Sequence, residues 1–169
     1  MPNLDIYVNI DVYIVKNHYL NLSFSLVQEG TCFMKEIKST SIQPKVRELL
    51  SFATSEKNVE KEYDLYMQSP GRKLYKYDLE TEVAGCIGIE LLGPKRCEIK
   101  HIAVSSNCRG IGIGSKMISF ILEKYSVSFM SAETDKDAVN FYRKYGFKIT
   151  SLGEKYPGVE RFQCILKAE

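Results

Sequence analysis

The sequence predicts one α/β (α+β) domain in which an antiparallel meander of strands leads into a parallel strand–helix–strand unit. Short apolar segments alternate with turn residues over positions 74–104, which is typical of strands joined by tight turns. Three glycines within 110–114 then separate an apolar strand-like run from an amphipathic helical run. A second apolar run follows that helix, and two strands connected through a helix favour parallel pairing.

Composition limits the classes of protein to consider. The 169 residues are 44% apolar and 26% charged, as in an ordinary globular domain, and the formal charge of +2 is too small to indicate nucleic acid or a membrane surface. The five cysteines form no C-x-x-C pair and the two histidines lie far apart, so we expect reduced thiols, no metal and a cytoplasmic protein. No apolar run is long enough to span a bilayer, and the N-terminus lacks the basic region of a signal peptide.

Residues 1–33 differ in pattern from the rest, and a new pattern begins at Met34. One hypothesis is that they are an upstream read-through, because Gln28-Glu29-Gly30 can be encoded by a purine-rich run resembling a bacterial ribosome-binding site. The other is a genuine N-terminal hairpin that packs on the domain or on a partner. We therefore expect an extension over 1–33 and a domain over 34–169.

The first elements of that domain are a short strand and two helices. A strand is expected over 37–42, and Pro44 suits the first turn of the helix that follows. Apolar residues recur at helical spacing in that helix, at Val46, Leu49, Leu50 and Ala53. A second helix begins at Ser55 and ends before the Ser69-Pro70-Gly71 stop signal.

The meander follows, with expected strands over 74–77, 82–92 and 96–104. In the last of these, alternation places Cys97 and Ile99 on one face and Ile102 and Val104 on the other. A bulge near Lys100-His101 would bring both pairs to one face and free backbone groups from the ladder. The alternative is a strand buried on both faces.

The elements after the glycines alternate between helix and strand. They are a helix over 116–125, a strand over 127–132, a helix from Asp135 or Asp137 to Gly146, a strand over 147–152, a mobile loop over 154–158 and a final antiparallel strand over 161–166.

The glycine-rich stretch at 109–115 lies at a strand-to-helix corner. Glycine permits sharp turns and close approach of a ligand, and the first amides of a helix lack internal partners. Such a corner suits a phosphate or diphosphate, and Arg109 adds a positive charge. A tight turn without a ligand is the alternative, and the stretch is not a Walker A loop, because no Gly-Lys-Ser/Thr follows.

Two motifs carry a family resemblance. Arg109-x-x-Gly112-x-Gly114 resembles the acyl-CoA loop of the GNAT superfamily of acyl-CoA-dependent N-acetyltransferases, and Ala138-Val-x-Phe-Tyr142-x-x-x-Gly146-Phe147 resembles its second signature. The order of elements over 34–166 is also similar. The resemblance implies a mixed, mostly antiparallel, twisted sheet of about seven strands, splayed in the middle and flanked by about four helices.

The resemblance also implies acetyl-CoA as cosubstrate, with its diphosphate on the glycine loop and its pantetheine arm along the preceding strand. At the position near the second helix where many members carry Asn, this chain has Asp135, with Asn140 one turn further on. The residues expected to bind the cosubstrate are Ile102, Ala103, Val104, Arg109, Gly110, Ile111, Gly112, Ile113, Gly114, Ser115, Asp135, Asn140 and Tyr142.

The implied reaction is direct attack of a primary amine on the thioester, without an acyl-enzyme. A backbone N–H such as that of Val104 would stabilise the oxyanion, and Tyr142 would protonate the leaving thiolate, unless it is only a core aromatic. Glu98 is the expected general base, acting through water, with Glu90 and His101 as alternatives.

The acceptor is expected to be an amine of a small molecule or a peptide, and the final strand could pair across a two-fold axis to give a homodimer. Two other functions are compatible with parts of the sequence: a non-catalytic acyl-CoA-binding GNAT-like domain, and a flavin or nicotinamide enzyme. The meander before the glycines argues against the last, because a dinucleotide-binding fold opens with βαβ units.

Overall fold

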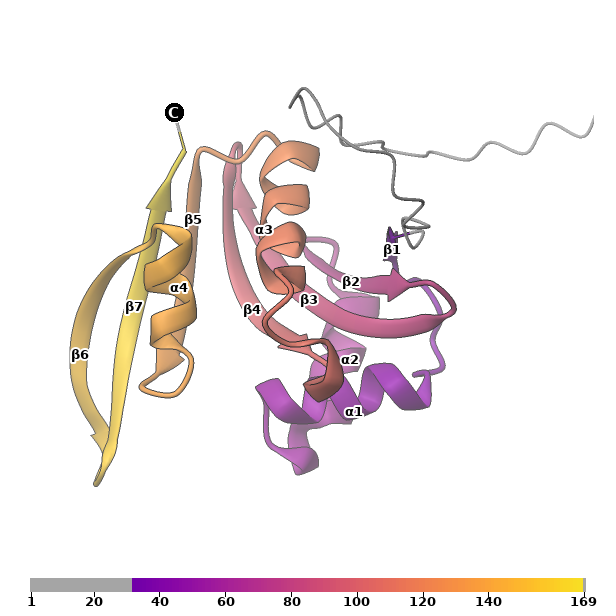
Figure 1. Cartoon of the computed structure of the whole chain (residues 1–169), viewed down its shortest axis with the longest axis horizontal. Coiled ribbons are helices and arrows are strands. Elements are labelled where there is room, and N and C mark those ends of the chain that lie inside the picture. The colour runs from indigo at the N-terminus through magenta and orange to yellow at the C-terminus, as the bar shows by residue number, and fades with distance from the viewer. Residues whose placement is uncertain (1–31, 169) are drawn as a thin grey trace, which may run out of the picture.

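The computed structural model describes residues 32–168 as one mixed sheet with helices on both faces (Figure 1). The strands are β1 (Cys32–Glu36), β2 (Arg72–Leu79), β3 (Glu82–Gly93), β4 (Arg96–Val104), β5 (Phe129–Asp135), β6 (Lys148–Tyr156) and β7 (Val159–Lys167). The helices are α1 (Pro44–Ala53), α2 (Val59–Gln68), α3 (Ile113–Lys124) and α4 (Val139–Tyr145), with short 3₁₀ turns η1 (Glu56–Asn58) and η2 (Ser106–Cys108).

The sheet has seven strands in the order β1-β2-β3-β4-β5-β7-β6. All neighbours pair antiparallel except β4 and β5, which are parallel and are joined through α3. The expected mixed, mostly antiparallel sheet and its single parallel unit are therefore confirmed.

The helices cover the two faces with separate apolar cores. On one face, α1 and α2 bury Leu49, Leu50 and Tyr63 against Leu74 and Cys86 of the sheet. On the other face, the larger core contains the buried side of α3, much of β3–β5 and α4. Its buried members are Tyr75, Tyr77, Ala84, Ile87, Ile89, Cys97, Ile99, Ile113, Met117, Ile118, Ile121, Val127, Met130, Ala132, Tyr142, Phe147 and Cys164.

The expected bulge in β4 is present. Ile102 pairs with Ile87 and Ile99 pairs with Ile89, so β4 has one more residue than β3 between these pairs. Ile99 and Ile102 consequently both contact the core under α3, although their positions differ by an odd number of residues.

The sheet opens between β4 and β5 beyond this bulge. Their parallel pairing begins at Arg96 with Phe129 and ends at Ile99 with Ala132. Figure 1 shows the two strands diverging below this point, with β5, β7, β6 and α4 on one side of the opening. The expected splay in the middle of the sheet is therefore found.

Two local expectations were wrong. The first strand covers Cys32–Glu36 instead of 37–42, because the chain in front of Ile37 is the part that pairs with β2. The expected loop over 154–158 is mostly strand, because β6 and β7 continue as a long hairpin that turns at residues 157–158.

The expected extension over 1–33 lies outside the described residues, except for Cys32 and Phe33, which belong to β1. The final strand, β7, lies between β5 and β6, so its edges are both occupied and it cannot pair across a two-fold axis as expected. None of the helices within 32–168 has the length and hydropathy required to cross a bilayer.

Candidate active site

The loop between η2 and α3 has a backbone shape that requires glycine. Gly110 has φ +81°, and Gly112, the N-cap of α3, has φ +85°. A Cβ at either position would meet nothing within 4 Å, so conformation and not crowding demands glycine there. The first amides of the 12-residue α3 lie at this loop, at the positive end of the helix dipole. This corner therefore suits an anionic group such as a diphosphate.

Gly114 has a different role. A Cβ on this residue would lie 2.9 Å from Cε2 of Phe141, closer than carbon atoms can approach without a shift. The first turn of α3 and the middle of α4 therefore come together over a glycine, which brings the second motif up to the first.

A groove of about 500 Å³ lies between the end of β4, the glycine loop, the start of α3 and α4. Most of the residues expected to bind the cosubstrate line it, namely Ile102, Ala103, Val104, Arg109, Gly110, Gly112, Ile113, Gly114, Ser115 and Tyr142. Ile111 does not line it, and its side chain is 59% exposed. The structure thus brings both sequence motifs to one groove.

The β4 edge of this groove presents backbone groups. Ser105 N–H donates to the Ala84 carbonyl at 2.8 Å. This bond shows which residues of β4 direct their backbone N–H and C=O groups toward β3. By antiparallel alternation, the N–H and C=O groups of Ile102 and Val104 then face away from β3. Because pairing with β5 ends at Ile99, these groups face the opening between the strands. An extended ligand lying along β4 can pair with them.

Arg109 links the loop to its surroundings. Its Nε donates to the Val104 carbonyl at 3.1 Å, and its guanidinium carbon lies 5.8 Å from the centre of the Phe52 ring in α1. Within residues 32–168 its terminal nitrogens have no hydrogen-bond partner, so those donors are available to an anion in the groove.

Tyr142 lies on the wall of the groove that α4 provides. Its ring is buried between Phe141 and Phe147, with both ring centres at 5.2 Å in edge-on geometry. Burial raises the pKa of its phenol above the ordinary value of about 10, so the hydroxyl stays protonated at neutral pH. This residue can therefore both pack the core and donate a proton into the groove.

Five groove residues were not expected from the sequence: Cys108, Ala138, Phe141, Lys144 and Tyr145. Ala138, Phe141 and Tyr145 recur at the helical spacing of Tyr142, so the amphipathic pattern of α4 carried a signal for them. Lys144 brings a cation to the groove. No local sequence pattern predicts its place there, because its position depends on how α4 packs against α3.

Asp135 and Asn140, also expected to bind the cosubstrate, lie outside the residues that line the groove. Asp135 Oδ1 accepts from the backbone N–H groups of Asp137 and Ala138, at 3.0 and 3.3 Å, and so supports the turn into α4. The side-chain oxygen of Asn140 accepts a hydrogen bond from Arg143. The contact of Asn140 thus lies within α4, whereas Asp135 Oδ2 also lies 4.0 Å from Arg161 Nη1 of β7.

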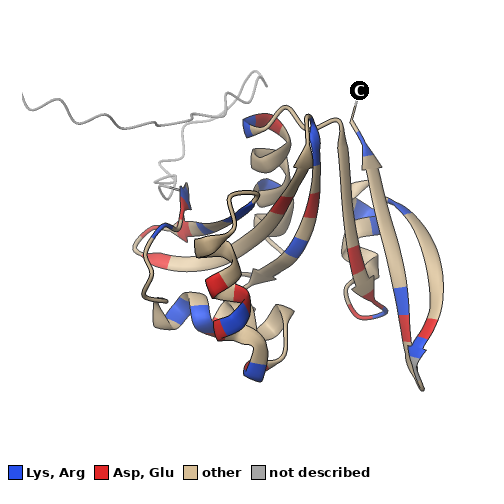
Figure 2. Cartoon of the chain, turned by 180° about the vertical axis from the view of Figure 1, so that it is seen from behind, with Lys and Arg blue, Asp and Glu red and all other residues tan. Residues whose placement is uncertain are grey.

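Glu98 lies on the sheet face opposite α3, beside a chain of ion pairs. Arg72 contacts Glu62 at 3.1 Å and Glu90 at 3.3 Å. Lys100 contacts Glu90 at 3.9 Å and Glu98 at 2.9 Å. The chain joins α2 to β2, β3 and β4, and Figure 2 shows acidic and basic positions along these central strands. Three carboxylates facing two cations make this side of the opening between β4 and β5 polar and slightly acidic.

His101 is buried beside the same chain, and its Nδ1 lies 2.6 Å from the Oη of Tyr66 in α2. Burial lowers the pKa of its imidazole below the ordinary value of about 6.5, so the ring is neutral at pH 7. Glu98 and His101, two of the expected candidate bases, thus lie on the same face of β4, away from Tyr142.

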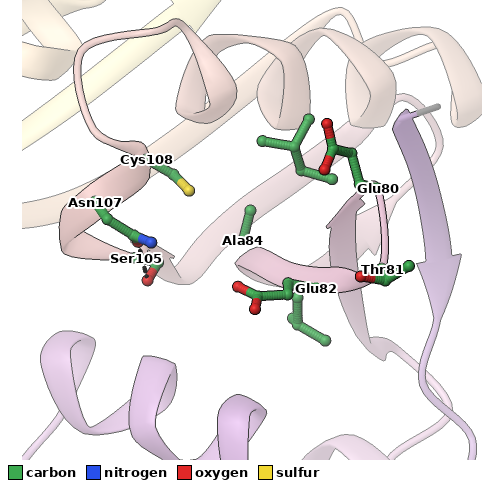
Figure 3. Close-up of a pocket in the computed structure, with 9 residues that line it drawn as sticks. Glu80, Thr81, Glu82, Ala84, Ser105, Asn107 and Cys108 are labelled. Atoms are coloured by element: carbon green, nitrogen blue, oxygen red, sulfur yellow. Dashed lines mark hydrogen bonds between the residues drawn. The ribbon is translucent and has the colours of Figure 1, made fainter. Parts of the chain in front are cut away.

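A smaller pocket of about 220 Å³ adjoins the groove, because Cys108 lines both. Figure 3 shows Glu80, Thr81 and Glu82 at the β2–β3 turn facing Ser105, Asn107 and Cys108 around η2. Ser105 Oγ donates to Asn107 Oδ1 at 2.8 Å and stabilises the η2 turn.

Comparison with known proteins identifies the family and the fold. A family model described as "Acetyltransferase (GNAT) domain" matches residues 70–149. An N-acetyltransferase encoded in the lysA 3′ region of Bacillus methanolicus, itself uncharacterized, is 31% identical over 80 residues, which are 46% of this chain and 67% of that protein.

Solved structures share the fold at lower identity. An IAA acetyltransferase from Bacillus cereus is 23% identical, with a TM-score of 0.64 over 82% of this chain and 100% of its own. A GNAT family acetyltransferase from Elizabethkingia anophelis, solved with acetyl-CoA bound, is 20% identical, with a TM-score of 0.62 over 81% and 98% of the two chains. Together with the family model and the Bacillus methanolicus relative, these observations show that the chain belongs to the GNAT family of acetyltransferases.

Proposed function

We propose that this protein transfers the acetyl group of acetyl-CoA to the nitrogen of a primary amine, carried by a small molecule or a peptide, by direct attack. The observation that carries the proposal is that one groove contains the glycine loop, the open side of β4 and the Tyr142 phenol. The name of the Bacillus methanolicus relative supports nitrogen as the acceptor atom, and the complex from Elizabethkingia anophelis supports acetyl-CoA as the donor.

The groove has the groups that acetyl-CoA requires. The amides at the start of α3 and the free donors of Arg109 suit its diphosphate. The outward N–H and C=O groups of Ile102 suit the peptide-like pantetheine arm, which would lie along β4 as an added strand does. This arrangement directs the thioester toward the bulge and the opening between β4 and β5.

At the thioester, attack by the amine nitrogen forms the new C–N bond and places negative charge on the carbonyl oxygen. An outward amide of β4, such as the N–H of Val104, stabilises that charge, and one such donor contributes roughly 3 kcal/mol to the transition state. After attack the nitrogen still carries one proton more than the amide product, and it loses that proton to water. The C–S bond then breaks, and the sulfur leaves as a thiolate that takes a proton from the Tyr142 phenol, which regains one from solvent. Burial keeps that phenol protonated at neutral pH, so its hydrogen is present when the sulfur leaves.

The attacking ammonium must first lose a proton, and we assign its acceptor as Glu98, acting through a water molecule. Glu98 is partly buried on the face of β4 opposite the cosubstrate groove, one residue before the pairing with β5 ends. An amine that enters from this face would meet Glu98 before it reaches the thioester. The salt bridge to Lys100 holds the carboxylate in place.

The test is thiol release from acetyl-CoA with a panel of amines that includes a polyamine, an aminoglycoside, a free peptide α-amine and a lysine peptide. We expect release with at least one of them, and none with its matched alcohol. Binding of CoA by calorimetry without release from any amine would favour the alternative, a non-catalytic acyl-CoA-binding domain. Absence of CoA binding would overturn both functions.

A further inference from the structure

Tyr66 and His101 form a buried pair directly behind the β4 bulge. The phenol oxygen of Tyr66 lies 2.6 Å from His101 Nδ1, and the two rings meet edge-on with their centres 5.9 Å apart. Tyr66 comes from α2, and His101 is one of the two β4 residues next to the register shift. The pair therefore connects a helix to the irregular point of the strand that borders the cosubstrate groove.

Gly88 makes this contact possible. It pairs with His101 across the β3–β4 ladder, and a Cβ on it would lie 2.0 Å from the Tyr66 Oη. The phenol thus occupies the space that a side chain at position 88 would fill. The φ of Gly88 lies outside the left-handed region, so crowding and not backbone conformation requires glycine there.

The contact fixes the position of the imidazole proton. Burial raises the pKa of the Tyr66 phenol, so it keeps its hydrogen. Within residues 32–168 the only hydrogen-bond partner of that hydroxyl is His101 Nδ1, and a buried hydroxyl without an acceptor is unfavourable. Tyr66 therefore donates and Nδ1 accepts. A neutral imidazole has one N–H, so its hydrogen lies on Nε2.

This tautomer has a chemical consequence. With hydrogen on Nε2 and Nδ1 occupied by the phenol, the ring has no free lone pair with which to accept a proton from an amine. The charged groups around it are Glu62 of α2, Arg72 of β2, and Lys100 of β4. None of these three residues hydrogen-bonds to the ring, so Tyr66 is the group that sets the tautomer.

We propose that Tyr66 is a positioning residue, which holds His101 in the Nε2–H form so that the imidazole anchors the β4 bulge and does not serve as the general base. The assignment rests on the proposed acetyl transfer, for which Glu98 is then the proton acceptor. It also explains how the register shift is held: the anchored residue directly precedes Ile102, whose backbone groups face the groove.

The first experiment measures the tautomer directly and needs no activity. In protein labelled with ¹⁵N in the histidine side chains, at pH 7.5, His101 should show a protonated Nε2 and an unprotonated Nδ1. A His101→Asn sample assigns the signals, since His18 is the only other histidine. Tyr66→Phe, or Gly88→Ala if the first variant does not fold, should give a mixture of tautomers. Hydrogen on Nδ1 in the parent protein would overturn the proposal.

The second experiment separates anchoring from base catalysis. His101→Asn keeps an acceptor near the Nδ1 position for Tyr66, whereas His101→Leu removes it. We expect His101→Leu to raise the KM for acetyl-CoA, and His101→Asn to restore it while kcat falls by less than about tenfold, with the acid limb of the pH profile retained. Loss of a general base would instead lower kcat by about 10²–10⁴-fold and remove that limb, and this result in His101→Asn would overturn the proposal. If the parent protein shows no turnover, acetyl transfer fails, while the tautomer measurement still decides the role of Tyr66.

Discussion

The Tyr142 side chain combines two requirements that usually exclude each other, because it packs in the core and also reaches a ligand groove. Its ring contacts Phe141 and Phe147, whereas its hydroxyl has no hydrogen-bond partner among residues 32–168. Removal of that hydroxyl should therefore leave the packing nearly intact, so the role of the phenol can be tested separately from that of the ring.

Tyr142→Phe should lower kcat by about 10²-fold or more, because a positioned proton donor is lost. The dissociation constant of CoA should change little, since the aromatic wall of the groove remains. Steady-state thiol release and calorimetry measure the two quantities, with Tyr63→Phe, in the core on the opposite face of the sheet, as the control. Equal losses of turnover and affinity would instead indicate that Tyr142 acts through packing.

At the scale of elements, the approach of α3 to α4 depends on one missing side chain. Gly114→Ala should force Phe141 aside, and overpacking of this kind costs about 1–3 kcal/mol, of which up to about 1 kcal/mol is offset by the higher helix propensity of Ala. Urea unfolding gives the free energy of unfolding. Phe141→Leu in the same chain should recover part of the loss. A double-mutant cycle that shows simple additivity would contradict direct contact between the two positions.

The β4 bulge shows which structural features could be predicted from this sequence. Its presence could be predicted because a regular strand would place Cys97 and Ile99 on one face and Ile102 and Val104 on the other. The bounds of β4 also agree with those expected. The position of the glycine loop at a strand-to-helix corner and of Tyr142 on a helix could also be predicted, because each is a local pattern. The contact of Tyr66 with His101 could not, because it joins residues 35 apart and leaves no periodic signal.

Two strand assignments failed for a related reason. The sequence around Gly153, Pro157 and Gly158 has the composition of a loop, yet pairing with β7 extends β6 to Tyr156. At the start of the domain, β2 pairs with Cys32–Glu36 and not with the segment 37–42 that follows. Tertiary pairing overrode local propensity in both places.

At the scale of the whole molecule, the β1–β4 side of the sheet and the β5–β7 side are joined within residues 32–168 by a short parallel pairing and by the core under α3 and α4. A ligand in the groove would contact β4 and α3 on one side and α4 on the other, so it should stabilise the fold. CoA at 100 times its dissociation constant should raise the free energy of unfolding by about 2.7 kcal/mol, or the melting temperature by about 5–10 °C. Differential scanning fluorimetry checks this, with pantetheine as the control that lacks the diphosphate. A shift as large with pantetheine would contradict the role of the glycine loop.

Stability should also depend on the protonation of His101. Its pKa is lowered by burial in the folded protein and takes its ordinary value, about 6.5, in the unfolded chain. Between these two values the unfolded chain binds more protons, so the free energy of unfolding rises with pH. This contribution is fully present above about pH 6.5 and is lost as the pH falls below it.

His101→Asn lacks this titration, so the free energy of unfolding of the parent relative to the variant should decrease between pH 7.5 and pH 5. Urea unfolding at both pH values measures it. A difference that stays constant would mean that His101 titrates equally in the folded and unfolded chains.

Because β7 lies inside the sheet, the two outer strands of the sheet are β1 and β6. An outer strand exposes unsatisfied amides and carbonyls to which another chain can add, and long regular ones promote aggregation. Within the described residues β1 has 5 residues, and the ladder of β6 with β7 shifts register between Ser151 and Gly153 and again between Glu154 and Tyr156. The regular stretch that β6 offers to a neighbouring chain is thus Lys148 to Ser151, and the fold in this way limits uncontrolled growth of its sheet into fibrils.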